Sequence, residues 1–106
     1  MLRYDIAEKG EDFVVLRISG ELAGDLEVDR LHDVLEEHYV DDGVRVIRVD
    51  LQDVTFLSLE GVAMLVDLLQ ESKERGKRFV VEGIRGQPRS KLTITGVLPV
   101  VAPDEG

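Results

Sequence analysis

The sequence predicts an α/β fold, a mixed β-sheet of about five strands layered with about three helices. Short segments rich in valine and isoleucine alternate with longer segments whose apolar residues recur every three or four positions. A short glycine-containing turn joins the first two apolar segments, whereas helical segments separate the later ones. We therefore expect an N-terminal hairpin followed by parallel strands with right-handed crossovers.

The hairpin is expected at residues 4–8 and 12–19, joined through the sequence KGED. A helix is expected from Asp25 to about Tyr39, because apolar residues there recur at helical spacing. Asp25 is the expected N-cap of this helix, and the sequence DDG at residues 41–43 is its expected end. The apolar residues that would line its buried face are Val28, Leu31, Val34, Leu35 and Tyr39.

A valine-rich segment at residues 44–51 is expected to be an inner strand of a mostly covered sheet, although Arg45 and Arg48 interrupt it. Helical spacing resumes at Gly61, and the predicted helix ends in the sequence SKERG, where Gly76 supplies the C-terminal turn. The residues expected on the side of this helix that faces the sheet are Val62, Leu65, Val66 and Leu69.

Three further elements complete the predicted fold. The sequence RFVVEGI at residues 78–84 is a predicted strand. The sequence QPRSKLTITG at residues 87–96 is a predicted short helix, with Pro88 in its first turn and Gly96 at its end. The sequence VLPVV at residues 97–101 is the predicted last strand.

The length of 106 residues and the hydrophobic content of 43% fit one compact domain over residues 1–106, with residues 102–106 as a flexible tail. No apolar run approaches the roughly 18 to 20 residues that a membrane-spanning helix needs, and the N-terminus lacks the pattern of a signal segment. We therefore expect a cytoplasmic protein without direct membrane insertion. The absence of cysteine excludes disulfides and thiolate catalysis.

Negative charge is concentrated in one part of the chain. The net charge is −9, which argues against nucleic acid as a partner, because phosphate contacts need a basic surface. Residues 21–42 hold nine acids against the single base Arg30. Such a run is usually the solvated face of a helix, but a concentrated acidic face also suits a basic protein partner. The nine acids are Glu21, Asp25, Glu27, Asp29, Asp33, Glu36, Glu37, Asp41 and Asp42.

The sequence contains no recognisable pattern of catalytic or metal-binding residues. His32 and His38 lie six residues apart on the predicted first helix. Six residues are a rotation of about 600°, so the two rings point to opposite sides and would not share a metal. Glycines occur without the lysine and hydroxyl residues of a phosphate-binding loop. We therefore expect no enzyme activity, no metal and no cofactor.

The segment TFLSLEG, from Thr55 to Gly61, lies where a predicted buried strand passes into a predicted helix. Function in parallel α/β sheets gathers at such strand ends, where a helix N-terminus presents unpaired N–H groups. Ser58 is the expected N-cap, with its hydroxyl accepting from the N–H of Glu60 or Gly61. Glu60 would then lie in the first turn, where a negative charge is stabilising by roughly 0.3 to 1 kcal/mol.

Several short motifs, taken in order, resemble the STAS domain, the fold of bacterial anti-sigma factor antagonists. They are GEL at residues 20–22, VDL at residues 49–51, VTF before the junction, Gly61 in the second helix, RGKRFVVEG at the next strand and PRSKLTITGV at the proline-started helix. Their order and spacing cover nearly the whole chain. The resemblance implies a non-enzymatic regulatory protein that binds an anti-sigma factor with a kinase-like ATP-binding domain and so influences sigma-factor-dependent transcription.

In the family that this chain resembles, the junction has an aspartate, two hydroxyl residues and a glycine, and the partner phosphorylates the second hydroxyl. Alignment on Gly61 places Ser58 at the aspartate, Leu59 at the first hydroxyl residue and Glu60 at the phosphoacceptor. The resemblance therefore implies a protein that is not switched by phosphorylation at this position. Ser58 is a poor substitute, because two residues at a helix entrance displace a side chain by about 3 Å along the axis and about 200° around it.

Two hypotheses for Glu60 stay open. A glutamate carries about one negative charge on two oxygens, whereas phosphoserine carries about 1.5 to 2 on three. In the first hypothesis Glu60 imitates the phosphorylated state, as a phosphomimetic residue, and weakens partner binding. In the second, a partner with arginine or lysine opposite Glu60 binds constitutively.

The partner-binding surface that the resemblance implies combines the junction with the start of the acidic helix. Its expected residues are Leu57, Ser58, Leu59, Glu60, Gly61, Met64, Leu68, Glu21 and Asp25. Met64 and Leu68 are expected either to form an exposed apolar ridge with Leu59 or to be partly buried under the neighbouring helix.

The same family supplies an alternative function, namely a small subunit of a membrane transporter complex, lipid transporters included, or a piece of a signalling scaffold. The terminal helix common in the family is not expected after VLPVV. Part of the sheet would then be less covered, which leaves open a homodimer.

Overall fold

The computed structural model describes residues 2–105, and these form a mixed four-stranded sheet of order β1-β2-β3-β4. Strand β1 (Arg3–Lys9) pairs antiparallel with β2 (Phe13–Leu22). Strand β3 (Val46–Leu57) is parallel to both β2 and β4 (Arg78–Glu82). The predicted α/β class, the N-terminal hairpin and the parallel pairing of the later strands are therefore confirmed.

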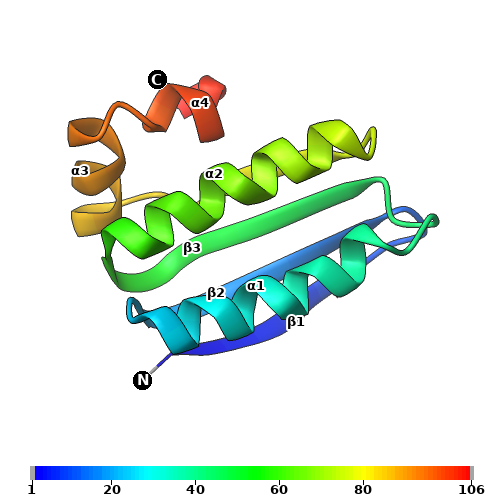
Figure 1. The fold of residues 1–106 in the computed structure, drawn as a ribbon, viewed down its shortest axis with the longest axis horizontal. Coiled ribbons are helices and arrows are strands. Elements are labelled where there is room, and N and C mark those ends of the chain that lie inside the picture. The colour runs from blue at the N-terminus through cyan, green and yellow to red at the C-terminus, as the bar shows by residue number, and fades with distance from the viewer. Residues whose placement is uncertain (1, 106) are drawn as a thin grey trace.

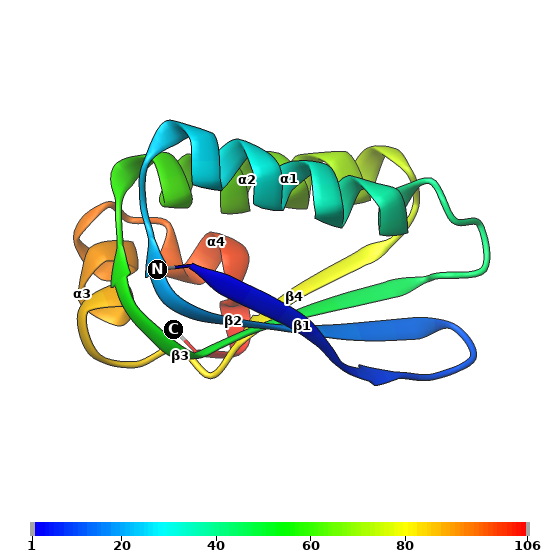
Figure 2. The same cartoon turned by 90° about the horizontal axis from the view of Figure 1, so that it is seen from below.

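Helices lie over one face of this sheet. Figures 1 and 2 show α1 (Asp25–Tyr39) and α2 (Leu59–Glu74) side by side above the strands. Helix α3 (Gly86–Ile94) lies at the end of the sheet where β3 finishes, and α4 (Leu98–Val101) lies beyond α2. A short 3₁₀ turn, η1 (Pro103–Glu105), ends the described chain.

The prediction of a fifth strand at the sequence VLPVV is wrong, because these residues form the loop after α3 and the helix α4. Pro99 stands in the first turn of that helix. A proline there loses no hydrogen bond, whereas in a strand it would leave a gap in the ladder of N–H donors. Residues 2–105 thus form four strands and four α-helices, where about five and about three are predicted.

The predicted boundaries of α1 are confirmed, but its predicted N-cap is not. The N-cap is Gly24, which has a φ of 83° and provides no side-chain cap. Asp25 is instead the first residue of the helix, where its negative charge lies close to the positive end of the helix dipole.

Strand β3 is an inner strand, as predicted, but the sheet is covered on one face only. Ile47, Val49 and Leu51 point toward the helices and are fully buried. Arg48 and Asp50 alternate with them and lie on the opposite face, over which the described chain places no helix (Figure 2). Arg48, which interrupts this valine-rich segment, therefore marks the solvent face of the sheet, whereas Arg45 precedes the strand.

Ion pairs connect neighbouring strands on this uncovered face. Arg17 Nε lies 3.5 Å from Asp50 Oδ2, and these two residues are partners in the β2–β3 register. Arg48 donates to Glu82 Oε2 at 2.6 Å between β3 and β4, and this hydrogen bond raises the pKa of the Arg48 guanidinium.

One apolar core lies between the sheet and the helices, and it includes residues from β2, β3, β4 and every α-helix. It also includes Ala102, which is buried, contrary to the expectation of an unanchored segment from that residue on. The residues after Ala102 form η1, and Gly106 lies outside the described residues. Flexibility of the terminal residues stays a prediction.

Candidate functional site

The junction between β3 and α2 has the predicted N-cap. Ser58 Oγ accepts a hydrogen bond from the Gly61 N–H at 3.1 Å, and the Ser58 backbone is extended. The Ser58 N–H in turn donates to the carbonyl oxygen of Leu22 at the end of β2, at 3.0 Å. The helix entrance is therefore fixed to two strands, and Glu60 is placed in the first turn as predicted.

Gly61 allows α2 to lie directly on the strand ends. A Cβ atom at this position would lie 2.6 Å from Leu57 Cδ1 and 2.9 Å from the carbonyl oxygen of Leu22. Real Cβ atoms essentially never approach other atoms this closely. The glycine is thus required by close packing of the helix start against β2 and β3, and no unusual backbone angle is involved.

A side chain from α3 holds the other side of the junction. The Leu57 N–H donates to Gln87 Oε1 at 2.7 Å, and Gln87 Nε2 donates to the Leu57 carbonyl oxygen at 3.1 Å. One amide side chain therefore satisfies both backbone groups of the last residue of β3. Gln87 is not among the residues expected at the site, because a lone glutamine at the start of a short helix gives no signal in the sequence.

An acidic groove lies beside the junction, between α1 and α2, with a volume of about 230 Å³. Carboxylates from both helices line it, namely Asp25 and Asp29 from α1 and Glu60 and Asp67 from α2. The remaining lining residues are Val28, His32, Ala63 and Met64. Asp29 and Asp67 are not among the expected site residues, although each lies at helical spacing from one that is, four residues after Asp25 and seven after Glu60.

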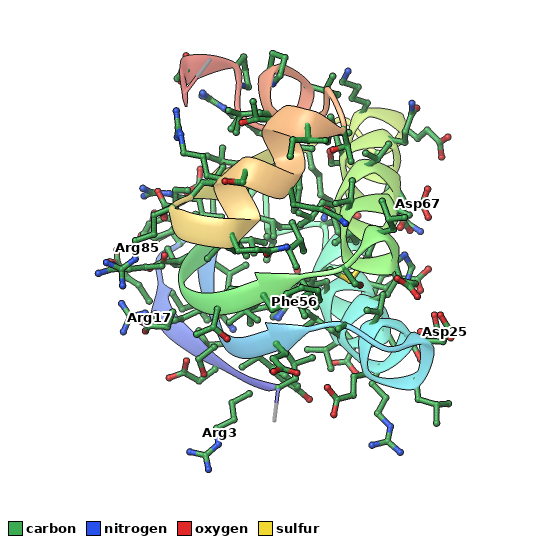
Figure 3. All side chains as sticks on the ribbon, turned by 90° about the vertical axis from the view of Figure 1, so that its left-hand side faces the viewer. Arg3, Arg17, Asp25, Phe56, Asp67 and Arg85 are labelled. Carbon is green, nitrogen blue, oxygen red and sulfur yellow. The ribbon has the colours of Figure 1, made fainter. Side chains whose placement is uncertain are left out.

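Two acidic and two basic side chains mark the two sides of the molecule in the view onto the junction end. Figure 3 looks at this end, with Asp25 and Asp67 on the side of α1 and α2, and Arg17 and Arg85 on the side of the uncovered sheet face. Phe56, near the end of β3, lies between them in this view and is partly exposed.

A family model for the STAS domain matches residues 4–105. The chain belongs to the STAS domain family.

Two curated STAS relatives are similar to the chain along most of its length. Both are proteins described as anti-sigma-B factor antagonist, one from Listeria monocytogenes and one from Listeria innocua. Each is 23% identical over 97 residues, which is 92% of this chain and 83% of the relative.

Solved STAS structures have the same fold. The anti-sigma factor antagonist SpoIIAA in its unphosphorylated form gives a TM-score of 0.79 at 18% identity, covering 92% of this chain and 84% of that one. An anti-sigma factor antagonist from Mycobacterium paratuberculosis gives 0.77 at 21% identity, covering 97% and 84%. A sulfate transporter family protein from Wolinella succinogenes gives 0.72 at 18% identity, covering 87% and 73%. These likenesses show the STAS fold.

The structure divides the expected surface of this STAS domain into exposed and buried residues. Glu21, Asp25, Leu59 and Glu60 are exposed. Leu59 is 61% exposed at the start of α2, and Leu26, a residue that is not among those expected, is 75% exposed in the first turn of α1. The exposed part of the site is therefore acidic with two apolar side chains beside it.

Four of the residues expected on the partner-binding surface are buried in the structure, namely Leu57, Gly61, Met64 and Leu68, so this chain does not expose them to a partner. The alternative of burial under the neighbouring helix is the one confirmed for Met64 and Leu68. The buried residues of α2 are Gly61, Val62, Met64, Leu65, Leu68 and Ser72. Val62 and Leu65 are therefore buried as predicted, whereas Val66 and Leu69 are only partly buried. Met64 and Leu68 are buried as well, because α1 packs along the flank of α2.

Tyr39 ties these two helices together. Its hydroxyl donates to the carbonyl oxygen of Leu68 at 3.0 Å. Burial raises the pKa of the Tyr39 phenol, and the negative charge of Glu71 raises it further, while a hydrogen bond with Ser72 has the opposite effect. The phenol is therefore held neutral in the folded protein.

His32 lies between the two helices with a carboxylate near each ring nitrogen. Nδ1 is 3.9 Å from Glu36 Oε2, and Nε2 is 3.9 Å from Glu71 Oε2. The ligand atoms of His32, Asp33 and Glu36 lie within 4.8 Å of one another, which is the spacing of a metal site. Asp33 is exposed, and both ring nitrogens already face carboxylates, so this cluster is adequately explained as a contact between α1 and α2.

No helix among residues 2–105 is long and apolar enough to cross a membrane.

Proposed function

We propose that this STAS domain is a non-enzymatic regulatory binding protein of the anti-sigma factor antagonist kind. It binds an anti-sigma factor with a kinase-like ATP-binding domain in the cytoplasm and thereby influences sigma-factor-dependent transcription. The curated relatives, which are described as anti-sigma-B factor antagonists, support this proposal. The exposed junction supports it too, because helix N-termini at strand ends are where binding sites gather in parallel sheets.

The proposal rests mainly on the position of Glu60 and on the absence of a partner for its carboxylate among the described residues. Its carboxylate is exposed in the first turn of α2, and no hydrogen bond or ion pair within residues 2–105 engages it. Alignment on Gly61 gives Glu60 the place of the hydroxyl that the family phosphorylates. A carboxylate cannot accept a phosphoryl group to form a stable ester as serine does, so the surface keeps about one negative charge at all times.

The surroundings of Glu60 favour the hypothesis of constitutive binding. Asp25, Asp29 and Asp67 lie around the same groove, so the field there is negative whether or not a further charge is added. A partner surface with arginine or lysine opposite Glu60 would form charge-assisted hydrogen bonds and be attracted over a distance. Leu59 and Leu26 flank this region and would contribute apolar contacts.

Ser58 does not replace the missing hydroxyl in this proposal. Its Oγ already accepts from the Gly61 N–H as the N-cap of α2. A phosphate on Ser58 would disturb this cap, and it would lie beside the acidic groove. In this proposal, phosphorylation at the junction does not switch partner binding, and the protein stays competent to bind at all times.

A second candidate function has its own support. A sulfate transporter family protein from Wolinella succinogenes and the STAS domain of a SulP transporter from Vibrio cholerae share the fold, with TM-scores of 0.72 and 0.61. This chain would then be the STAS subunit of a membrane transporter complex, or part of a signalling scaffold. This second function does not explain why Glu60 has an exposed carboxylate without a partner among residues 2–105.

Direct binding separates the two functions. The purified protein, carrying an affinity tag, is used to capture partners from its own organism, and each recovered protein is then produced alone and its affinity measured by calorimetry. A kinase-like ATP-binding protein that binds wild type but binds Glu60→Lys at least about tenfold more weakly supports the antagonist. The exposed Gln70→Lys on α2 is the matched control for added positive charge. Direct binding only to a transporter ATPase would replace the first function by the second.

A further inference from the structure

The sheet has two outer strands, β1 and β4, and each presents one edge that pairs with no other strand of the described chain. In Figure 1, β1 runs along the bottom of the molecule, and β4 lies behind α2 on the opposite side. An open strand edge offers unpaired N–H and C=O groups to another chain. The two edges differ in how well they could pair with a second copy of themselves.

Strand β1 is poorly suited to such pairing. Its register with β2 shifts between Ile6 and Glu8, which interrupts the regular edge. An antiparallel pair centred on Ile6 would also place Arg3 opposite Lys9 twice, once on each side of the two-fold axis. Like charges directly opposite are destabilising, and bulges and edge charges are common devices against edge pairing.

Strand β4 has the opposite properties. Its five residues, RFVVE, pair with β3 in an unbroken parallel register from Arg78 to Glu82. Arg78, Val80 and Glu82 point to the uncovered face of the sheet, and the apolar Phe79 and Val81 alternate with them toward the core. In an antiparallel pair centred on Val80, each Arg78 lies opposite Glu82 of the second copy.

A groove beside β4 leaves its edge accessible. All five residues of β4 line this groove, and residues 101–104 form its other wall, with a volume of about 260 Å³ between them. Val101 and Ala102 on that wall point into the core of their own chain, so the wall presents little apolar surface to the groove. An added strand in this groove would pair with the backbone groups along β4.

We propose that two copies of this protein associate through their β4 strands, which pair antiparallel about Val80 and join the two sheets into one. Val80 of one copy lies opposite Val80 of the other, Phe79 lies opposite Val81, and two Arg78–Glu82 pairs lie on the uncovered face. Glu82 keeps its bond to Arg48 of the same chain, because a carboxylate has two oxygens and accepts from two guanidinium groups.

The pairing is weak, and it leaves the acidic groove free. Five residues a strand form an interface smaller than the roughly 1,200 Å² of a standard complex, so we expect a dissociation constant of about 10⁻⁵ to 10⁻³ M. No residue of β4 lines the groove that contains Glu60. The dimer therefore presents two partner-binding sites, and it does not depend on the proposed function.

Charge reversal tests the register. Sedimentation equilibrium of wild type from about 10 μM to 1 mM is expected to show a reversible monomer–dimer equilibrium. Arg78→Glu alone or Glu82→Arg alone places like charges opposite each other twice, so each single variant is expected to dimerise at least about tenfold more weakly. An equimolar mixture of the two variants restores both opposite-charge pairs and is expected to form a heterodimer about as tight as wild type.

The heterodimer is the control for folding, because a misfolded variant would not regain affinity on mixing. Ile6→Lys on β1 is the matched control for the other edge and should leave the dissociation constant within about twofold. Wild type that stays monomeric at 1 mM overturns the proposal. So does a mixture that associates no better than either variant alone, or loss of the dimer in Ile6→Lys.

Discussion

The side-chain amide of Gln87 binds both backbone groups of Leu57, accepting from its N–H at 2.7 Å and donating to its carbonyl oxygen at 3.1 Å. Leu57 is the last residue of β3, and its register partner on the other side is Leu22 of β2. Gln87 thus takes the place that a neighbouring strand would have at this point. The chain then turns into α2 at Ser58 with both flanks held, which fixes where Glu60 emerges.

Replacing Gln87 is expected to loosen the junction. Gln87→Ala leaves two partly buried backbone groups of Leu57 without partners, so the free energy of unfolding should fall by about 1 to 3 kcal/mol. Urea unfolding measures the loss, and hydrogen exchange of the Leu57 amide shows whether it is local. Gln70→Ala, at an exposed position on α2, is the control and should change stability by less than about 0.5 kcal/mol. Equal stability of the two variants would contradict the role of Gln87.

Gly61→Ala is expected to destabilise the protein through overlap of atoms. The added Cβ would overlap with Leu57 Cδ1 and with the carbonyl oxygen of Leu22. The Leu22 oxygen belongs to the backbone, so it can move only if the end of β2 moves with it. Overpacking of this kind costs about 1 to 3 kcal/mol, in spite of the better helix propensity of alanine. Thermal unfolding gives the difference, with Glu60→Ala one residue earlier on the exposed side as comparison. A gain in stability for Gly61→Ala would show that the junction relaxes more easily than its contacts indicate.

Stability is expected to fall at high pH because of Tyr39. Its pKa is raised in the folded protein, so the unfolded chain loses the phenolic proton first as pH rises. The contribution of Tyr39 is fully present below about pH 10, the ordinary pKa of tyrosine, and is lost progressively above it. Urea unfolding at pH 7 to 11 measures this decline, and Tyr39→Phe should flatten its alkaline part while losing the bond to Leu68. An identical alkaline decline in the variant would assign the effect to other groups.

Much of the framework follows from local patterns. Helix α1 begins and ends at the predicted residues because its apolar residues recur at helical spacing and Gly24 and the DDG sequence bound it. Ser58 is predicted correctly as the N-cap, because a serine hydroxyl at a strand-to-helix transition readily accepts a hydrogen bond from a backbone N–H of the first turn, here that of Gly61. These features depend on neighbours within a few residues.

What could not be predicted depends on contacts between distant segments. The burial of Met64 and Leu68 comes from α1, whose position beside α2 no local spacing reveals. The hydrogen bonds between the Gln87 side chain and the Leu57 backbone join residues thirty positions apart in the sequence. The sequence VLPVV has the composition of a strand, but it forms a turn of helix instead. This helical turn places Leu98 and Val101 in the core.

The most direct test of the central claim is the affinity of this STAS domain for the anti-sigma factor that we propose as its partner, measured by calorimetry before and after hours of incubation with ATP and magnesium. We predict that the wild-type affinity does not change and that intact mass shows no added phosphate. Glu60→Ser is predicted to bind at least about tenfold more weakly, because a charge-assisted contact is lost. Tighter binding by Glu60→Ser would show that Glu60 imitates the phosphorylated state. A phosphate on wild-type Ser58 with loss of affinity would contradict the claim that binding is fixed in one state.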